Sequence, residues 1–277
     1  MKSIKMIALD LDGTTLNRKS QITERTRRAL KGAMEKGVHI VVSTGRCYDA
    51  IPEEVIGVEG LEYIINSNGA DITRTSDRKS IYTNHLSVTA VNEILELFKD
   101  RDFNHLSLEA VIDRKTYMDK EEFLHITSLK PSFRELAYVR DTRTPADNLN
   151  EYIYENRHRI ENINIIFDTL ELKAEYRDVL SKISDSTMTT SFTNNYEIGG
   201  KTTSKAEALR FLMERLNVTR DELMACGDSP NDEDMIKFAG FGVAMGNALP
   251  EVKEIADYVT LSNEEDGVAA VIEKYVL

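Results

Sequence analysis

The sequence contains few cysteines, no low-complexity segment and no long apolar run. Its two cysteines, Cys47 and Cys226, are too few for a disulfide framework, which favours a reducing, cytoplasmic setting. No uninterrupted apolar stretch approaches the ~20 residues of a membrane span, so we expect no membrane partner. The first residues carry no apolar segment followed by a small-residue cleavage site, so we also expect no signal peptide.

Positive charge is outnumbered by negative charge. The 277 residues contain 35 Lys and Arg against 47 Asp and Glu, which gives a net charge of −12. We therefore expect no nucleic-acid partner, because sequence-independent binding depends on Lys and Arg contacts to phosphates. An acidic chain that handles a phosphate ester needs local positive charge or a metal ion.

The length suits one large domain or two modest ones, and a monomer is consistent with the sequence.

Apolar runs alternate with amphipathic segments toward both ends of the chain. The strand-like runs occupy residues 4–9, 38–42, 63–65, 223–226, 241–244 and 258–260. The helical patterns occupy residues 23–36, 202–216, 230–239, 250–256 and a last segment from 267. This order predicts an α/β fold, with a Rossmann-like parallel sheet and helices on both faces. In such sheets the functional loops follow the carboxyl ends of the strands.

The middle of the chain has a different pattern. A helical face at Val88, Val91 and Ile94 is followed by a hairpin pattern at 106–118, with its turn at 113–115. A strand at 163–167, a helix at 170–183 and a strand at 187–192 come next. We expect residues 84–188 to form an inserted α+β domain, and residues 1–83 and 189–277 to form the discontinuous core.

Two carboxylates, Asp10 and Asp12, end the first apolar run. In extended backbone, residues i and i+2 point to the same side, so both should face one site. Buried negative charge requires a partner, which here indicates a cation. A calcium loop does not fit, because Thr15 stands where that loop has glycine and Gln21 where it has glutamate. Taken alone, the pattern is about as typical of a solvated turn as of an active site.

A second acidic group follows the strand at 223–226. Pro230 suits the first turn of a helix, and acids at 232–234 are explained by the helix dipole. Asp228 precedes that helix and is not explained in this way. Asp228 is therefore a candidate ligand for a hard metal ion, shared with Asp10.

The helix at 202–216 begins with an unusual cation. Ser204 and Glu207 have the spacing of a capping box, which places Lys205 at the first helical position. The helix dipole disfavours a cation there. A solvated surface lysine is the more common explanation, and the alternative is that Lys205 and the helix terminus bind an anion. Thr44 and Gly45, at the end of another strand, could offer a hydroxyl and an amide to a phosphate oxygen.

The ordered set of motifs resembles the haloacid dehalogenase-like phosphatases, specifically the Cof-type subfamily with a C2-type inserted cap. The matching segments are Asp10-Leu-Asp-Gly-Thr14, Ser43-Thr-Gly-Arg46, Ser67-Asn-Gly-Ala70, Ser204-Lys205, Gly227-Asp-Ser-Pro-Asn-Asp232, Gly242-Val-Ala-Met-Gly-Asn-Ala248 and Asp266-Gly-Val-Ala269. They span both parts of the core in the family's order.

The resemblance implies a role for each matched residue. Asp10 would attack phosphorus, and Asp12 would protonate the leaving alcohol and then activate water. The residues expected to bind the substrate phosphoryl group are Thr44, Gly45, Lys205 and Asn231. The residues expected at a Mg²⁺ site are Asp10, Asp12 (through its backbone carbonyl), Asp228 and Asp232.

The leading hypothesis is a Mg²⁺-dependent phosphatase that acts on a small phosphorylated metabolite such as a sugar phosphate. The inserted domain would act as a lid that excludes water. The alternatives are a phosphomutase similar to phosphomannomutase and a non-catalytic sensor of a phosphorylated metabolite. A dehalogenase is disfavoured, because the resemblance implies that dehalogenases lack the second aspartate, and a P-type pump is excluded by the missing membrane spans.

Overall fold

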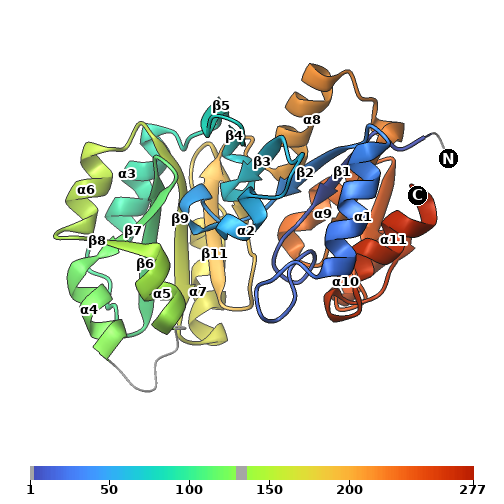
Figure 1. Cartoon of the computed structure of the whole chain (residues 1–277). Helices are drawn as coiled ribbons and strands as arrows, with labels where there is room; N and C mark the ends of the chain where they lie inside the picture. The colour runs from blue at the N-terminus through green and yellow to red at the C-terminus, as the bar shows by residue number, and fades with distance from the viewer. Residues whose placement is uncertain (1–2, 129–135) are drawn as a thin grey trace. The chain divides into compact units, whose positions relative to one another are not determined.

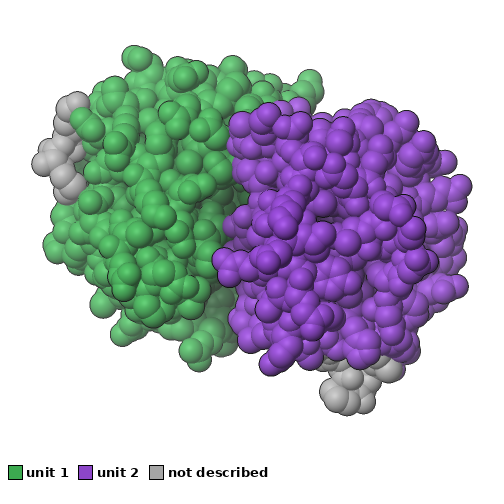
Figure 2. Space-filling view, turned by 180° about the vertical axis from the view of Figure 1, so that it is seen from behind, with its two compact units in different colours: residues 1–46, 51–82, 204–277 green, residues 47–50, 83–203 purple. Residues whose placement is uncertain are grey.

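The computed structural model describes residues 3–128 and 136–277. The chain divides into two compact units, each with its own sheet (Figures 1 and 2). Unit 1 comprises residues 1–46, 51–82 and 204–277, and unit 2 comprises residues 47–50 and 83–203. The discontinuous unit 1 thus contains both ends of the chain, where the sequence predicted βαβ units.

Unit 1 is built on an eight-stranded sheet with the order β14-β13-β12-β1-β2-β3-β4-β5. Neighbouring strands from β14 to β3 are parallel, and β4 is antiparallel to β3. The strands are β1 (Met6–Leu9), β2 (His39–Ser43), β3 (Tyr63–Asn66), β4 (Asp71–Arg74), β5 (Lys79–Thr83), β12 (Leu223–Gly227), β13 (Phe241–Ala244) and β14 (Tyr258–Val259). The predicted α/β fold with a mainly parallel sheet is confirmed.

Helices cover both faces of this sheet (Figure 1). On one face, α8 and α9 pack on alternate strand residues that include Met6, Ala8 and Val41. On the other face α1 lies beside α11 (Figure 1). The helices of unit 1 are α1 (Glu24–Glu35), α2 (Glu53–Ile56), α8 (Lys205–Leu216), α9 (Glu233–Phe238), α10 (Pro250–Glu254) and α11 (Gly267–Tyr275), with short 3₁₀ turns η2 (Ser67–Gly69) and η4 (Pro230–Asp232).

The strand register brings the predicted functional loops to one edge of the sheet. Leu9 of β1 is paired with Val42 of β2 on one side and with Cys226 of β12 on the other. The three strands are parallel, so their carboxyl ends meet at the same level. The loops that begin at Asp10, Thr44 and Asp228 therefore lie next to one another.

Unit 2 contains a six-stranded sheet with the order β10-β11-β9-β6-β7-β8. Its strands are β6 (Leu106–Ile112), β7 (Lys115–Asp119), β8 (Arg143–Ala146), β9 (Ile160–Phe167), β10 (Ser186–Thr189) and β11 (Asn195–Gly200). Its helices are α3 (Val88–Leu97), α4 (Lys120–Ser128), α5 (Leu136–Thr142), α6 (Leu149–Glu155) and α7 (Leu170–Leu180). Residues from β6 and β9 such as Leu108 and Ile163 form its apolar core with Ile94 of α3.

The predicted hairpin is present in unit 2, while one strand extends past the predicted boundary. Asp113 and Arg114, the turn between β6 and β7, have φ values of 49° and 70°, as a tight two-residue turn requires. Strand β11 lies beyond residue 188, yet it pairs with β9 and β10. Its sequence mixes polar residues with two glycines, so it lacks a strand pattern. Within the described ranges, no helix combines the length and the apolar character that crossing a bilayer requires.

Candidate active site

Asp10, Lys205 and Asp232 form a buried ion cluster beyond the end of β1. The Lys205 side chain is only 1% exposed, although it stands at the first position of α8. Its Nζ donates to Asp10 Oδ1 at 2.7 Å and to Asp232 Oδ1 at 2.6 Å. Ser204 caps the helix by accepting from the Glu207 amide. Lys205 is therefore a buried lysine with two carboxylate partners, and not a solvated surface residue.

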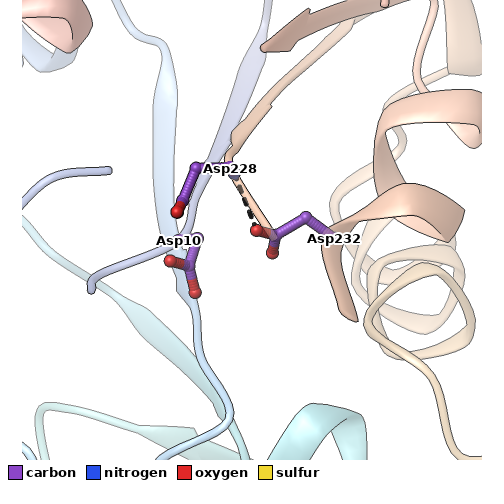
Figure 3. Close-up of side chains that lie close together, drawn as sticks. All are labelled: Asp10, Asp228 and Asp232. Atoms are coloured by element: carbon purple, nitrogen blue, oxygen red, sulfur yellow. Dashed lines mark hydrogen bonds between the residues drawn. The ribbon is translucent and has the colours of Figure 1, made fainter. Parts of the chain in front are cut away.

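A third carboxylate, that of Asp228, joins this cluster. One carboxylate oxygen from each of Asp10, Asp228 and Asp232 lies within 4.8 Å of the others. Figure 3 shows the three side chains close together, with a dashed line that joins Asp232 to Asp228. Backbone amides hold the Asp232 carboxylate in place, because its Oδ2 accepts hydrogen bonds from the amides of Asp228 and Ser229 at 2.9 and 3.1 Å. The cluster thus combines the ends of two neighbouring strands with the turn that precedes α9.

Close packing around Asp228 explains the glycine that follows Asp12. Gly13 has a φ of 78°, and a Cβ atom there would lie 2.5 Å from Asp228 Oδ2. The hydroxyl of Thr14 donates to Asp228 Oδ1 at 2.9 Å. The loop after β1 therefore wraps around Asp228 and fixes its carboxylate.

The pKa values of the cluster reflect its excess of negative charge. Burial, followed by repulsion from Asp232, raises the pKa of Asp10 well above its ordinary value. Burial and repulsion from Asp232 likewise raise the pKa of Asp228, to about 6. Burial disfavours the Lys205 ammonium, but the nearby charges of Asp10 and Asp232 outweigh burial and raise its pKa. The Lys205 side chain is therefore charged, and its single positive charge does not balance the three carboxylates around it.

The donor set suits a small divalent cation. Three carboxylates opposite one ammonium leave two negative charges in excess, and hard oxygen ligands are what Mg²⁺ prefers. Asp232 already uses both oxygens for Lys205 and two amides. Asp10 and Asp228 are therefore the better candidates for direct ligands, with Asp232 as a brace.

The carboxylates of Asp10 and Asp12 differ in exposure, and the expectation that both face one site stays a prediction. The chain turns at Leu11, whose carbonyl accepts hydrogen bonds from the backbone amides of Thr14, Thr15 and Leu16. The alternation of side chains in a strand therefore ends before Asp12. The Asp12 side chain is 55% exposed, whereas Asp10 is buried.

Asp12 is instead clamped by Arg46. The Arg46 Nε and Nη2 atoms donate to the two Asp12 carboxylate oxygens, each at 2.7 Å. This two-pronged geometry fixes the plane of the carboxylate. Arg46 lies in the Ser43-Thr-Gly-Arg46 motif, and no role for it was predicted. Only the opposite charges on neighbouring strand ends could have suggested its contact with Asp12.

The residues expected to bind a phosphoryl group lie around the same edge. Thr44 is 1% exposed, and its hydroxyl accepts from the Arg46 amide at 3.2 Å. The Asn231 side chain donates from Nδ2 to Asn68 Oδ1 at 3.0 Å. Gly45 lies against the side-chain amide groups of both asparagines, since a Cβ on Gly45 would be 3.1 Å from Asn68 Oδ1 and 3.3 Å from Asn231 Nδ2. Asn68 is a second residue for which the sequence predicted no role.

The chain is similar to phosphatases over nearly its whole length. The sequence profile of the haloacid dehalogenase-like hydrolases matches residues 7–272. Phosphatase YwpJ of Bacillus subtilis is 32% identical, over 96% of this chain and 98% of its own. The 5-amino-6-(5-phospho-D-ribitylamino)uracil phosphatase YcsE of the same organism is 31% identical, over 99% of this chain and 96% of its own.

Solved structures give the same result. A haloacid dehalogenase-like hydrolase from B. subtilis has a TM-score of 0.81 and 29% identity, covering 99% of this chain and 100% of that protein. A phosphatase of the haloalkanoate enzyme superfamily from Bacteroides thetaiotaomicron has a TM-score of 0.80 and 26% identity, covering 99% of this chain and 96% of that protein. The chain belongs to the haloacid dehalogenase-like hydrolases and is a phosphoric monoester hydrolase of that family.

Proposed function

We propose that this protein is a Mg²⁺-dependent phosphatase that hydrolyses a small phosphomonoester through an aspartyl-phosphate on Asp10. The observation that carries the proposal is the cluster of Asp10, Asp228 and Asp232 around the buried Lys205. Phosphoryl transfer requires a nucleophile and positive charge beside the phosphoryl oxygens, and a carboxylate next to a lysine and a cation site would supply both.

Asp10 would be the nucleophile. An oxygen of its carboxylate forms a bond to phosphorus while the bond from phosphorus to the ester oxygen breaks. Lys205 holds the carboxylate through Oδ1, which orients it, and places positive charge beside the phosphoryl oxygens. Thr44, Gly45 and Asn231 would complete the phosphoryl site.

Asp12 would handle the protons. It donates a proton to the leaving alcohol oxygen, and then takes one from the water that attacks the aspartyl-phosphate. That second step releases inorganic phosphate and regenerates Asp10. The clamp by Arg46 fixes the Asp12 carboxylate before substrate arrives. Asp12 leaves the clamp and takes up a proton from solvent before it protonates the leaving oxygen, and the proton that it later takes from the attacking water returns to solvent when the clamp forms again.

The residues that would hold Mg²⁺ are Asp10, Asp228 and the backbone carbonyl of Asp12. When bound, the ion would offset the negative charge of the carboxylates and of the phosphoryl oxygens, so that one anion can approach another. Thr14 and Asp232 keep Asp228 and Lys205 in place through the contacts described above.

We propose unit 2 as the cap domain that recognises the leaving group. It has its own core and is inserted in the chain between β5 and α8 of unit 1. Two relatives, YcsE and YitU of B. subtilis, are named for a phosphorylated ribityl compound. A phosphorylated sugar or sugar alcohol is therefore the substrate class that we favour. A cytoplasmic setting stays a prediction.

Phosphate release tests the proposal. The enzyme is incubated with p-nitrophenyl phosphate, sugar phosphates and the ribityl compound, with Mg²⁺ or with EDTA. We expect turnover that requires the metal and that Asp10→Asn abolishes, while the surface variant Asp77→Asn retains it. Formation of an isomeric sugar phosphate in place of free phosphate would favour a mutase, and metal-independent turnover would contradict the proposed Mg²⁺ dependence.

A further inference from the structure

Three consecutive residues after β3 have left-handed backbone. Ser67, Asn68 and Gly69 have φ values of 50°, 56° and 96°. For a residue other than glycine this conformation costs about 1–3 kcal/mol, and such residues persist where their surroundings hold them. Two of them in succession, at the carboxyl edge of the sheet, indicate that this turn has a task that an ordinary turn would not fulfil.

The turn joins the loop that follows β2. The Ser67 amide donates to the Arg46 carbonyl at 2.8 Å, and the Asn68 amide donates to the Thr44 carbonyl at 3.0 Å. Thr44 and Arg46 flank Gly45, so these two hydrogen bonds fix the backbone of the proposed phosphoryl site.

The side chain of Asn68 reaches the same site. It is 4% exposed, and its Oδ1 accepts from Asn231 Nδ2 at 3.0 Å. A Cβ on Gly45 would lie 3.1 Å from Asn68 Oδ1 and 3.3 Å from Asn231 Nδ2. The absence of a side chain at Gly45 therefore leaves the space that the two amides occupy.

A simpler explanation is that asparagine is present only because it tolerates left-handed backbone better than most residues. That explains the φ value and nothing else. Glycine would tolerate the conformation at less cost, yet it could not contact Asn231. The buried side chain and its contact with Asn231 therefore need a separate cause.

We propose that Asn68 is a positioning residue that orients the Asn231 amide toward the phosphoryl group. The acceptor Oδ1 of Asn68 takes one N–H of Asn231, which fixes the side-chain torsion and keeps the amide group from reversing. The second N–H of Asn231 is then directed in advance, so less ordering is needed when the anion binds. This inference rests on the proposed function, because it assigns a phosphoryl oxygen to Asn231.

The test compares Asn68→Gly with Asn217→Gly. Glycine keeps left-handed backbone available, so the first variant removes only the side chain. Asn217, the C-cap of α8, is also left-handed, with a φ of 54°, and serves as the matched control. Binding of inorganic phosphate is measured by calorimetry with Mg²⁺ present. We expect Asn68→Gly to raise the dissociation constant about tenfold, as for loss of one well-placed hydrogen bond, and Asn217→Gly to leave it unchanged.

A double-mutant cycle with Asn231→Ala separates positioning from other roles. If Asn68 acts through Asn231, Asn68→Gly has no further effect in the Asn231→Ala background. Additive losses would mean that Asn68 contacts the anion itself, and an unchanged dissociation constant for Asn68→Gly would mean that only its backbone matters. Either result overturns the inference. Wild-type protein that binds phosphate but hydrolyses no ester would contradict the proposed function, and the cycle would still test Asn68.

Discussion

Replacing Asp228 by asparagine should stabilise the metal-free protein, although it should impair the enzyme. The pKa of Asp228 is raised from 3.8 to about 6, mainly by burial and then by Asp232. A raised carboxyl pKa means that the folded state resists ionisation, so the charge at neutral pH opposes folding. Asparagine has almost the same shape and carries no charge.

The size of the effect follows from the pKa shift. About two pKa units correspond to about 3 kcal/mol of unfolding free energy at a pH of about 7.5, where Asp228 is ionised in both states. Between the two pKa values the folded state binds more protons than the unfolded state, so wild-type stability falls as the pH rises. The advantage of Asp228→Asn should therefore shrink to roughly half of that value at a pH of about 5.

Local contacts do not oppose the substitution. Asp228 accepts from the hydroxyls of Thr14 and Ser229 at 2.9 and 3.1 Å. A hydroxyl can donate or accept, so both can bond to an amide group. Asp232→Asn is the contrasting control, because it removes charge from a side chain that holds Lys205 and two amides. We expect that variant to lose about 3 kcal/mol or more.

The assay is urea unfolding in EDTA at several pH values, followed by circular dichroism. Hydrogen exchange of amides in β1 and β12 reports on unit 1 itself. A saturating level of Mg²⁺, about 100 times its dissociation constant, should add about 2.7 kcal/mol to the wild type and much less to Asp228→Asn. The reasoning fails if Asp228→Asn is no more stable than the wild type in EDTA, or if its advantage does not depend on pH.

Three further substitutions test other charged contacts. Lys205→Met leaves Asp10 and Asp232 without their cation, and it should cost about 3–5 kcal/mol in thermal or urea unfolding and abolish turnover. Loss of the Arg46–Asp12 ion pair in Arg46→Ala should account for less than about 1 kcal/mol of stability, because Asp12 is half-exposed. The same variant should lower kcat about tenfold in steady-state assays without weakening phosphate binding, since Arg46 would no longer hold Asp12 in a fixed position until the substrate releases it. Arg143→Met in unit 2 leaves Glu109 buried without its ion-pair partner, and hydrogen exchange in β6 should show a loss of about 3–5 kcal/mol, with unit 1 unaffected.

The sequence predicted the architecture best where local pattern and packing agree. The strands of the parallel sheet are short apolar runs separated by helices, and their ends carry the polar residues of the site. Strand β8 in unit 2 was not predicted, because Arg-Thr-Pro-Ala has no strand pattern. Its position at the edge of the sheet tolerates Pro145.

The side-chain environments were harder to predict than the strands. The spacing of Asp10 and Asp12 did not predict that the chain turns at Leu11, nor that Asp12 is half-exposed while Asp10 is buried. The contacts of Arg46 and Asn68 join loops that are far apart in the sequence, so no local pattern encodes them. Sequence spacing places a residue on an element, while the partner of a loop side chain depends on which strand ends become neighbours.

Lys205 shows why an apparent mismatch in a sequence can mark a site. At the first position of α8 the helix dipole costs a cation a few tenths of a kcal/mol, about 0.3–1. Complete burial of an unpaired ammonium would cost far more. A surface lysine would have only the small dipole cost, whereas Lys205 has both, and Asp10 and Asp232 offset them. The carboxylates in turn outnumber the lysine, so the cluster that stabilises Lys205 still attracts a second cation.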